Sequence, residues 1–466
     1  MVEWEPARVG EAVRAAAERI DVHRGELEAL VRIPSVSAAG FDPAHVVASA
    51  EMTADLLARC GLEAVRLVAP TGGHPNVIGE WCHAGPQAPT VLLYAHHDVQ
   101  PPGVTEHWTS GPFEPVVRDG RLYGRGSADD KAGAVAHGAA IAAWLETTGT
   151  LPCNVKVLVE GEEEIGSPNL GTFLTDHAGE LAADVLVLAD AGNWSVGTPG
   201  ITYSLRGLLG FDVNLRALDG PLHSGLAGGV VPDPATALAR LVASMVDVHG
   251  DVCVDGFSDD VRPVSPEESA RMAALSPDPA AMARTLGMRK GVSMAGDPAV
   301  PVLERLWMRP TLTVIGCDSH PIAGSSNQIV AAATARISMR LAPGQDPQRC
   351  WECVQRHVLT HAPWGLEVSL NTHETVPAWV CEPEGPAFDA ATNALRAGFG
   401  ADAVLMGVGG TIPFVGPFAA AFGGIPALLL GPADPASRIH GEDESVHLGD
   451  WAKLIASEIH LLAELA

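Results

Sequence analysis

The stretch Val91-Leu-Leu-Tyr-Ala-His-His-Asp98 decides the fold that the sequence predicts. Its first four residues are apolar and lack helical spacing, which favours a buried strand. The stretch then ends in two imidazoles and a carboxylate. Because ligands of open α/β sheets bind beyond the carboxyl ends of the strands, we expect the chemistry of the protein at this point.

Two further apolar runs end in carboxylates in the same way. Residues 155–159 lead into Glu162, Glu163 and Glu164, and residues 185–188 lead into Asp190. We interpret both runs as strands of the same sheet, so that their acidic ends lie at one edge.

A separate segment, Gly124–Lys131, places Asp129 and Asp130 at the start of an Ala-rich helix. Taken singly, each of these features has an ordinary explanation: a loop histidine, a solvated acidic face or a helix N-cap. Taken together, these features have no such ordinary explanation, because adjacent buried carboxylates repel one another and protonate unless a cation lies among them. The set predicts one acidic, histidine-containing metal pocket.

Helical and strand-like segments alternate up to residue 199, which indicates an α/β domain with a largely parallel sheet. From 200 to 376 the order becomes strand-helix-strand-strand-helix-strand, an inserted α+β unit of βαββαβ type. After 376 the α/β pattern returns. We therefore expect a catalytic metal-binding domain of residues 1–199 and 377–466, and a lid and dimerisation domain of residues 200–376.

Two long segments are each expected to form a single uninterrupted element. Apolar residues at helical spacing predict a single helix over residues 7–32, which Pro34 ends. Residues 200–216 read as one long strand.

Length and composition narrow the class of protein. A chain of 466 residues is too long for one ordinary core, so two or more domains are expected. A formal charge of −27 disfavours nucleic acid and anionic membranes as partners. Eight scattered cysteines with one unpaired CxxC disfavour a zinc ribbon and suit a reducing cytoplasm. We see neither a signal peptide nor an apolar run long enough to span a bilayer.

Seven pieces of the sequence resemble one known family, in the order in which that family carries them. The pieces are Tyr94-Ala-His-His-Asp-Val-Gln-Pro101, Gly124-Arg-Gly-Ser-Ala-Asp-Asp-Lys131, Glu160-Gly-Glu-Glu-Glu-Ile-Gly-Ser-Pro168, Asp190, Leu222-His-Ser-Gly225, Gly409-Gly-Thr-Ile-Pro413 and His440-Gly-Glu-Asp-Glu444. The family is that of the co-catalytic di-zinc exopeptidases, which includes carnosinases, cytosolic dipeptidases, carboxypeptidase G, aminoacylases and succinyl-diaminopimelate desuccinylase. The first and third pieces resemble its dipeptidase-like branch.

The resemblance implies two divalent metal ions and their ligands. His96 and Asp190 would bind one ion, Glu164 and His440 the other, and Asp129 would bridge both. Zinc suits histidine and carboxylate ligands, and such an oxygen-rich set also accepts Mn or Co.

The resemblance also implies residues that act beside the metals. Glu163 would be the general base, which takes a proton from the metal-bridged water and passes it to the leaving amine. Asp98 would orient the imidazole of His96. The family further places a cis peptide bond between Asp129 and Asp130.

Other residues would contact the substrate. His223 matches a histidine that crosses a homodimer and stabilises the oxyanion in the partner's site. Arg340 matches an arginine that holds the substrate carboxylate. Asn327, and Gly410 with Thr411 in the glycine-rich loop, match substrate-binding positions.

One position departs from the dipeptidase pattern. Relatives carry Arg-Glu before the glycine-rich loop, where the Glu can meet the free amine of a substrate. Here Gly407 and Val408 stand instead, so an N-acyl, N-carbamoyl or otherwise neutral acyl group is expected as much as a free amine.

The predicted function is metal-dependent hydrolysis of an amide bond next to a free carboxylate, in a small peptide or an N-acyl amino acid. The alternatives are a dipeptidase for substrates with a free N-terminus and a catalytically inactive metal-binding dimer. The spare acid Glu163 argues against the inactive protein. A nucleotide-binding protein is disfavoured, because the sequence lacks a glycine-rich loop that would cradle phosphate.

Overall fold

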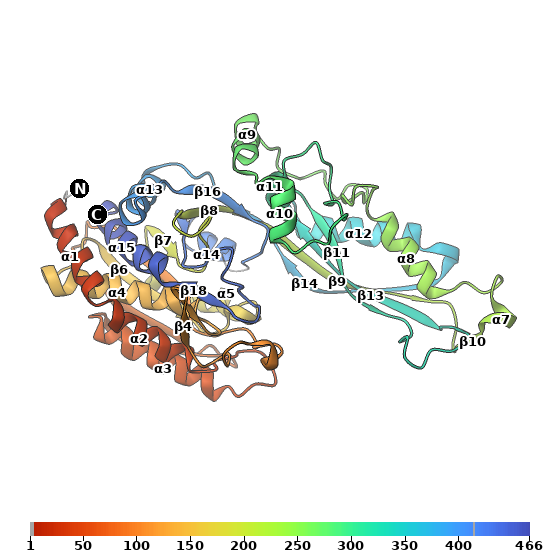
Figure 1. The fold of residues 1–466 in the computed structure, drawn as a ribbon, viewed down its shortest axis with the longest axis horizontal. Coiled ribbons are helices and arrows are strands. Elements are labelled where there is room, and N and C mark those ends of the chain that lie inside the picture. The colour runs from red at the N-terminus through yellow and green to blue at the C-terminus, as the bar shows by residue number, and fades with distance from the viewer. Residues whose placement is uncertain (1–3, 413–414) are drawn as a thin grey trace. The chain divides into compact units, whose positions relative to one another are not determined.

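The computed structural model describes residues 4–412 and 415–466 (Figure 1). These residues form two compact units. The first contains residues 4–203, 382–406 and 415–466, and the second contains 204–381 and 407–412. Among the described helices, none has the length and hydropathy needed to cross a membrane.

The first unit is built from helices around one sheet. Its described helices are α1 (Pro6–Glu18), α2 (Ile20–Val31), α3 (Ala44–Arg59), α4 (Lys131–Thr148), α5 (Leu170–Asp176), α6 (Ala178–Leu181), α13 (Pro386–Phe399), α14 (Val415–Ala421) and α15 (Leu448–Glu464), with short 3-10 turns η1 (Thr105–His107) and η2 (Glu163–Ile165). Its strands are β1 (Glu63–Val68), β2 (Asn76–Trp81), β3 (Thr90–His96), β4 (Val116–Arg118), β5 (Arg121–Tyr123), β6 (Asn154–Glu160), β7 (Val185–Leu188), β8 (Gly200–Leu205), β16 (Val404–Val408), β17 (Ala427–Leu429) and β18 (Ser445–His447).

The centre of this sheet is parallel and its margins are antiparallel. The strand order is β1-β2-β6-β3-β7-β17-β8, in which β6, β3, β7 and β17 pair in parallel. β2 pairs antiparallel with β6, and β8 with β17. A small separate sheet joins β18, β5 and β4. The predicted α/β class is confirmed.

The central strands are apolar throughout because helices cover the sheet. β7 is buried along its whole length, and β3 is buried from Val91 to His96. α4 packs on β3 and against α1 and α15 (Figure 1), and its small residues are buried on every side as far as Trp144. The Trp144 indole donates to the Ile459 carbonyl in α15 at 3.1 Å, which ties the two helices together.

Two predictions of continuity were wrong. The segment 7–32 forms α1 and α2, because Arg19 leaves helical geometry between them. The segment 200–216 forms β8 in one sheet and the separate strand β9 (Gly207–Arg216) in another, with Arg206 between the two strands. Apolar periodicity reports the type of an element and cannot report such a change of partner.

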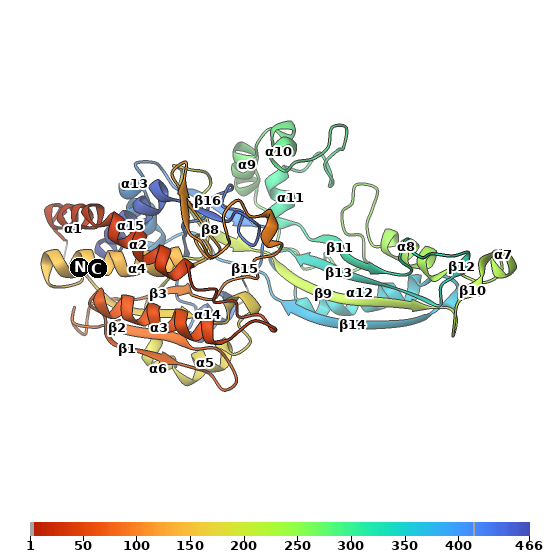
Figure 2. The same cartoon turned by 60° about the horizontal axis from the view of Figure 1, so that its bottom comes forward.

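The second unit is an α+β fold. Its described helices are α7 (Ser224–Ala227), α8 (Pro234–Ser244), α9 (Pro266–Leu275), α10 (Pro279–Thr285), α11 (Val302–Met308) and α12 (Pro347–His361), with the 3-10 turn η3 (Pro363–Gly365). Its strands are β9, β10 (Leu222–His223), β11 (Thr311–Asp318), β12 (Gln328–Ile329), β13 (Ala332–Leu341), β14 (Glu367–Val376) and β15 (Trp379–Val380). The main sheet has the antiparallel order β11-β13-β9-β14, and β10 pairs with β12 (Figure 2).

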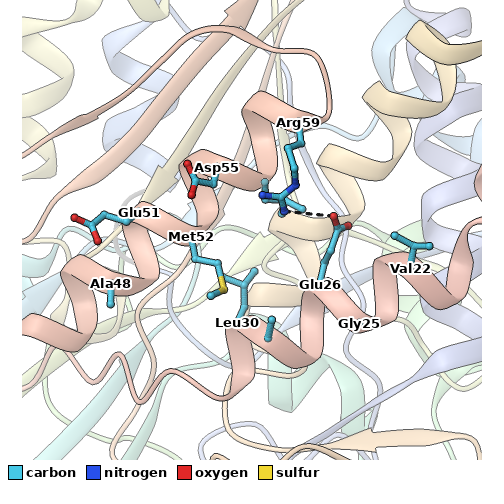
Figure 3. A pocket seen from close by; sticks show the side chains of 11 residues that line it. Val22, Gly25, Glu26, Leu30, Ala48, Glu51, Met52, Asp55 and Arg59 are labelled. Atoms are coloured by element: carbon cyan, nitrogen blue, oxygen red, sulfur yellow. Dashed lines mark hydrogen bonds and ion pairs between the residues drawn. The ribbon is translucent and has the colours of Figure 1, made fainter.

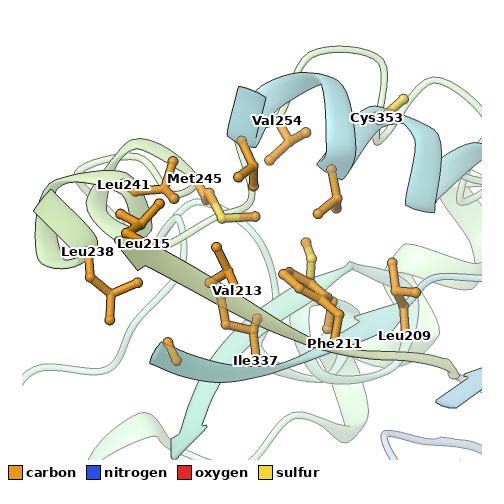
Figure 4. Close-up of a cluster of buried hydrophobic side chains, with 14 of the residues drawn as sticks. Leu209, Phe211, Val213, Leu215, Leu238, Leu241, Met245, Val254, Ile337 and Cys353 are labelled. Atoms are coloured by element: carbon orange, nitrogen blue, oxygen red, sulfur yellow. The ribbon is translucent and has the colours of Figure 1, made fainter. Parts of the chain in front are cut away.

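The core of this unit lies between the sheet and helices α8 and α12 (Figure 4). Alternate residues of β9 and β13 face these helices. The buried strand residues are Leu209, Phe211, Val213 and Leu215 from β9, and Ala333, Ala335, Ile337, Met339 and Leu341 from β13. Cys350 and Cys353 pack in the same core, and neither belongs to a disulfide.

The two compact units have their own boundaries along the chain. The divisions fall after residues 203 and 381, where the sequence predicts 199 and 376. Residues 407–412 group with the second unit, whereas the sequence assigns them to the catalytic domain. The reason is the set of hydrogen bonds between this loop and Arg206.

Candidate metal centre

The five predicted metal ligands come from five separate elements of the first unit. His96 ends β3, Asp129 precedes α4 and Glu164 lies in η2. Asp190 follows β7, and His440 lies in the loop between β17 and β18. The parallel pairing of β6, β3 and β7 brings the ends of these strands to one edge of the sheet.

The ligand atoms form two groups that share Asp129. In one group, His96 Nε2 lies 2.9 Å from Asp129 Oδ1 and 4.0 Å from Asp190 Oδ2. In the other, His440 Nε2 lies 3.0 Å from Asp129 Oδ2 and 3.2 Å from Glu164 Oε2. Each oxygen of Asp129 therefore faces a different histidine, which is the arrangement of a carboxylate that bridges two cations.

The acidic side chains of this cluster need positive charge. Burial, with repulsion from Asp129, raises the pKa of Asp190 well above its usual value and that of Glu164 to about 7. Burial likewise raises the pKa of Asp130 to about 8. Burial opposes ionisation of Asp129 as well, but hydrogen bonds with His440 and His96 prevail and lower its pKa. Imidazole and carboxylate donors with unmet negative charge fit divalent metal ions such as zinc.

Asp98 links the two halves of the cluster. It is fully buried, and its Oδ1 lies 3.4 Å from His96 Nδ1. Its carboxylate accepts the backbone N–H groups of Glu163 and Glu164 at 3.2 and 3.1 Å, and the Ser37 hydroxyl at 2.6 Å. Asp98 thus holds the η2 turn against the β3 end while it lies beside the imidazole of His96.

Gln100 is a supporting residue that the sequence reasoning missed. Its side-chain amide donates to Glu164 Oε2 at 2.8 Å, and its backbone N–H donates to Glu164 Oε1 at 3.0 Å. These bonds orient the Glu164 carboxylate. Gln100 belongs to the quoted piece 94–101, but its position along the chain does not reveal its partner.

Glu444 is a second missed residue. It is completely buried and accepts Arg125 Nη1 at 2.6 Å. Its carboxylate also accepts the backbone N–H groups of Gly126, Ala128 and Asp129 at 3.2, 3.0 and 3.2 Å. One side chain thereby ties the loop that carries His440 to the loop that carries Asp129.

Glu163 and Asp130 lie beside the ligands. Within the described residues, the Glu163 side chain has no hydrogen bond or ion pair, and burial raises its pKa well above the usual value. The peptide bond between Asp129 and Asp130 is cis. Among the described atoms, neither carboxylate oxygen of Asp130 has a hydrogen-bond partner.

The predicted substrate residues of the second unit fall into two places. In one, Arg340 Nη1 donates to the Thr411 hydroxyl at 2.7 Å, and the Gly410 carbonyl accepts the Arg206 N–H at 3.1 Å. In the other, His223 in β10 pairs with Gln328, and the Asn327 carbonyl accepts the adjacent Ser224 N–H at 2.9 Å.

These two places lie at or beyond opposite ends of strand β13. Arg340 is at the end of β13, and β12 with β10 lies beyond its beginning (Figure 2). At about 3.3 Å per residue, the ten residues of β13 span roughly 30 Å. Within one copy of the chain, His223 and Arg340 are therefore too far apart to touch one small substrate.

A groove of about 490 Å³ lies between α2 and α3 (Figure 3). Leu30 and Met52 form its floor, and the Glu26 carboxylate pairs with Arg59 at 3.5 Å. It contains none of the predicted metal or substrate residues, so it gives no argument about the reaction.

Comparison with known proteins identifies the family. A model of the peptidase family M20/M25/M40 matches residues 92–464. The chain belongs to this family. It is therefore a metallopeptidase, an enzyme that hydrolyses peptide bonds with the help of divalent metal, and the predicted family is confirmed.

Three known proteins show which members of the M20 family the chain is similar to. It is 34% identical over 361 residues to a cysteinylglycine-S-conjugate dipeptidase of Corynebacterium striatum, covering 77% of each protein. It is 27% identical over 403 residues to a Cys-Gly metallodipeptidase of Schizosaccharomyces pombe, covering 84% of this chain and 83% of that protein. The structure resembles that of human carnosine dipeptidase 1 with a TM-score of 0.85, 25% identity and 99% of each chain covered.

Proposed function

We propose that this M20 enzyme hydrolyses dipeptides and similarly small peptides at the amide bond next to a free C-terminal carboxylate. The similarity to Cys-Gly and carnosine dipeptidases supports this substrate class. The observation that carries the proposal is the pair of ligand groups that share Asp129, with the carboxylate of Glu163 beside them, which has no ion pair within the part of the chain that the structure describes.

Two zinc ions are the proposed cofactor, with Mn or Co as substitutes. His96 and Asp190 would hold one ion, His440 and Glu164 the other, and Asp129 both. The metal pair would supply Lewis acidity and a lowered water pKa at this site. Glu163 would accept the proton of the attacking water and deliver it to the leaving amine, a task that suits a carboxylate whose pKa burial raises well above its usual value.

Arg340 would hold the substrate carboxylate. Its guanidinium makes no ion pair among the described residues, and its one hydrogen bond there leaves other N–H groups available. Gly410 and Asn327 remain proposed substrate contacts.

A homodimer is the proposed working form. The roughly 30 Å between the ends of β13 means that His223 would serve the substrate held by Arg340 of a second copy. The open edge of β11 supports this idea, because Val314 and Ile315 are exposed there beside an apolar groove of about 290 Å³ next to α8. A reducing cytoplasm is proposed from the eight scattered cysteines of the sequence.

N-acyl amino acids are a second candidate substrate class. Gly407 and Val408 supply no carboxylate for a free substrate amine. The Cβ of a larger residue at 407 would lie 2.8 Å from Trp307 Cβ, so the indole occupies the space that a side chain there would need.

The test compares three preparations on one set of substrates. The enzyme as purified, the enzyme stripped by chelator and the stripped enzyme with zinc restored are assayed on Cys-Gly, β-Ala-His, their C-terminal amides and N-acetyl amino acids. We expect activity only with metal present and only on substrates with a free carboxylate. Activity that survives complete metal removal would reject the proposal.

Glu163→Gln tests the general base. We expect turnover to fall about 10²- to 10⁴-fold while zinc content is unchanged. Glu18→Gln is the matched control, since Glu18 is exposed and forms no ion pair among the described residues. Normal turnover in Glu163→Gln would show that another group is the base.

A further inference from the structure

Thr411 has a hydroxyl whose hydrogen bonds have a fixed direction. Its Oγ1 lies 2.6 Å from the Arg206 backbone carbonyl, which can only accept, so the hydroxyl must donate to it. The same oxygen lies 2.7 Å from Arg340 Nη1, which can only donate, so the hydroxyl must accept from it. Because a hydroxyl has one proton, Thr411 has none left for a substrate oxygen while these bonds hold.

Arg340 depends on this bond for its orientation. Among the described residues, the bond to Thr411 is its only hydrogen bond, and no carboxylate lies within ion-pair distance. Glu374 on β14 is the acid that acts on it from further away, and Arg340 is only partly buried. One fixed N–H leaves the other N–H groups of the planar guanidinium pointing in set directions.

Arg206 fixes the loop that carries Thr411. It is 6% exposed, and its Nε donates to the Gly409 carbonyl at 3.0 Å. Its backbone N–H bonds the carbonyls of Val408 and Gly410, so the loop that carries Thr411 is held at several points. All its described partners are uncharged, which leaves two guanidinium charges near one another without a paired acid.

We propose that Thr411 is a positioning residue for Arg340 and not itself a substrate ligand. Its hydroxyl joins the Arg206 carbonyl to the Arg340 guanidinium by two hydrogen bonds. The guanidinium is thereby oriented to bind the two oxygens of a substrate carboxylate. The second charge, on Arg206, adds to the attraction of that anion. This inference rests on the proposed function, in which Arg340 binds the carboxylate.

The test uses Thr411→Val, which keeps the shape and removes the hydroxyl, and Thr411→Ser, which keeps the hydroxyl. We expect Thr411→Val to raise KM for a carboxylate dipeptide about tenfold, the effect of one hydrogen bond to a charged group, with kcat within about twofold. Thr411→Ser should stay within about twofold in KM. Thr172→Val is the matched control, because Thr172 is exposed on α5 and makes no side-chain hydrogen bond among the described residues.

A double-mutant cycle separates positioning from direct contact. In an Arg340→Met background, Thr411→Val should have no further effect on KM, because the hydroxyl acts through Arg340. A full additional effect there would show that Thr411 touches the substrate, and an unchanged KM in Thr411→Val alone would also overturn the inference. If the unaltered enzyme shows no metal-dependent hydrolysis of any carboxylate substrate, the proposed function fails instead.

Discussion

Glu444→Gln removes the charge that joins the two ligand loops and keeps the shape of the side chain. In the structure, Glu444 Oε2 accepts hydrogen bonds from Arg125 and Gly126, and Oε1 accepts hydrogen bonds from Ala128 and Asp129. A glutamine offers one oxygen and one NH₂ group. In either orientation of the glutamine amide, two of these four donors lose their acceptor oxygen and face the NH₂ group, which is itself a donor.

The expected loss in the free energy of unfolding follows from the number of hydrogen bonds that are lost. Two lost hydrogen bonds amount to about 2 kcal/mol, and removal of one partner of a buried ion pair costs about 3–5 kcal/mol. The higher value applies because Arg125 is 1% exposed and would keep an unpaired charge. Since Glu444 holds the Asp129 backbone and follows His440 by four residues, zinc binding should weaken about 10- to 100-fold.

Two measurements check this prediction. Urea unfolding of the metal-free protein reports stability, and competition with a chelator reports zinc affinity. Asp402→Asn is the control, because the Asp402–Arg396 pair is exposed and its loss should leave both measurements unchanged. If Glu444→Gln matched the unaltered protein in both measurements, the account of Glu444 as the link between the loops would be refuted.

Three further predictions address other parts of the structure. Asp98→Asn should weaken zinc binding about 10- to 100-fold in the same chelator competition, and an unchanged affinity would contradict its orienting role. Burial lowers the pKa of His137, but the Glu458 carboxylate prevails and raises it, so the pair stabilises the fold most below the unfolded pKa of about 6.5 and less as the pH rises. Glu458→Gln should therefore reduce the free energy of unfolding more at about pH 6 than at about pH 9, and an equal loss at both would disprove the charge interaction. Gly407→Ala should cost about 1–3 kcal/mol in urea unfolding because its Cβ meets buried Trp307, and a neutral effect would show that the indole moves aside easily.

The elements around the site were predictable because their signals are local. An apolar run that ends in His96 or Asp190 indicates a strand and marks its carboxyl end, whatever the rest of the chain does. The order of the motifs then indicated the family. The breaks at Arg19 and Arg206 were not predictable, because both lie inside runs with unbroken apolar spacing.

By itself, the sequence determined which residue types gather at the strand ends, and hence the α/β class, the metal-binding chemistry and the M20 family. Only the tertiary structure decided how they are oriented: that each oxygen of Asp129 faces a different histidine, that Glu444 joins two loops, and that the proton of Thr411 points to Arg206. The physical reason is that hydrogen bonds depend on direction and on partners hundreds of residues away, whereas spacing along a chain encodes only near neighbours.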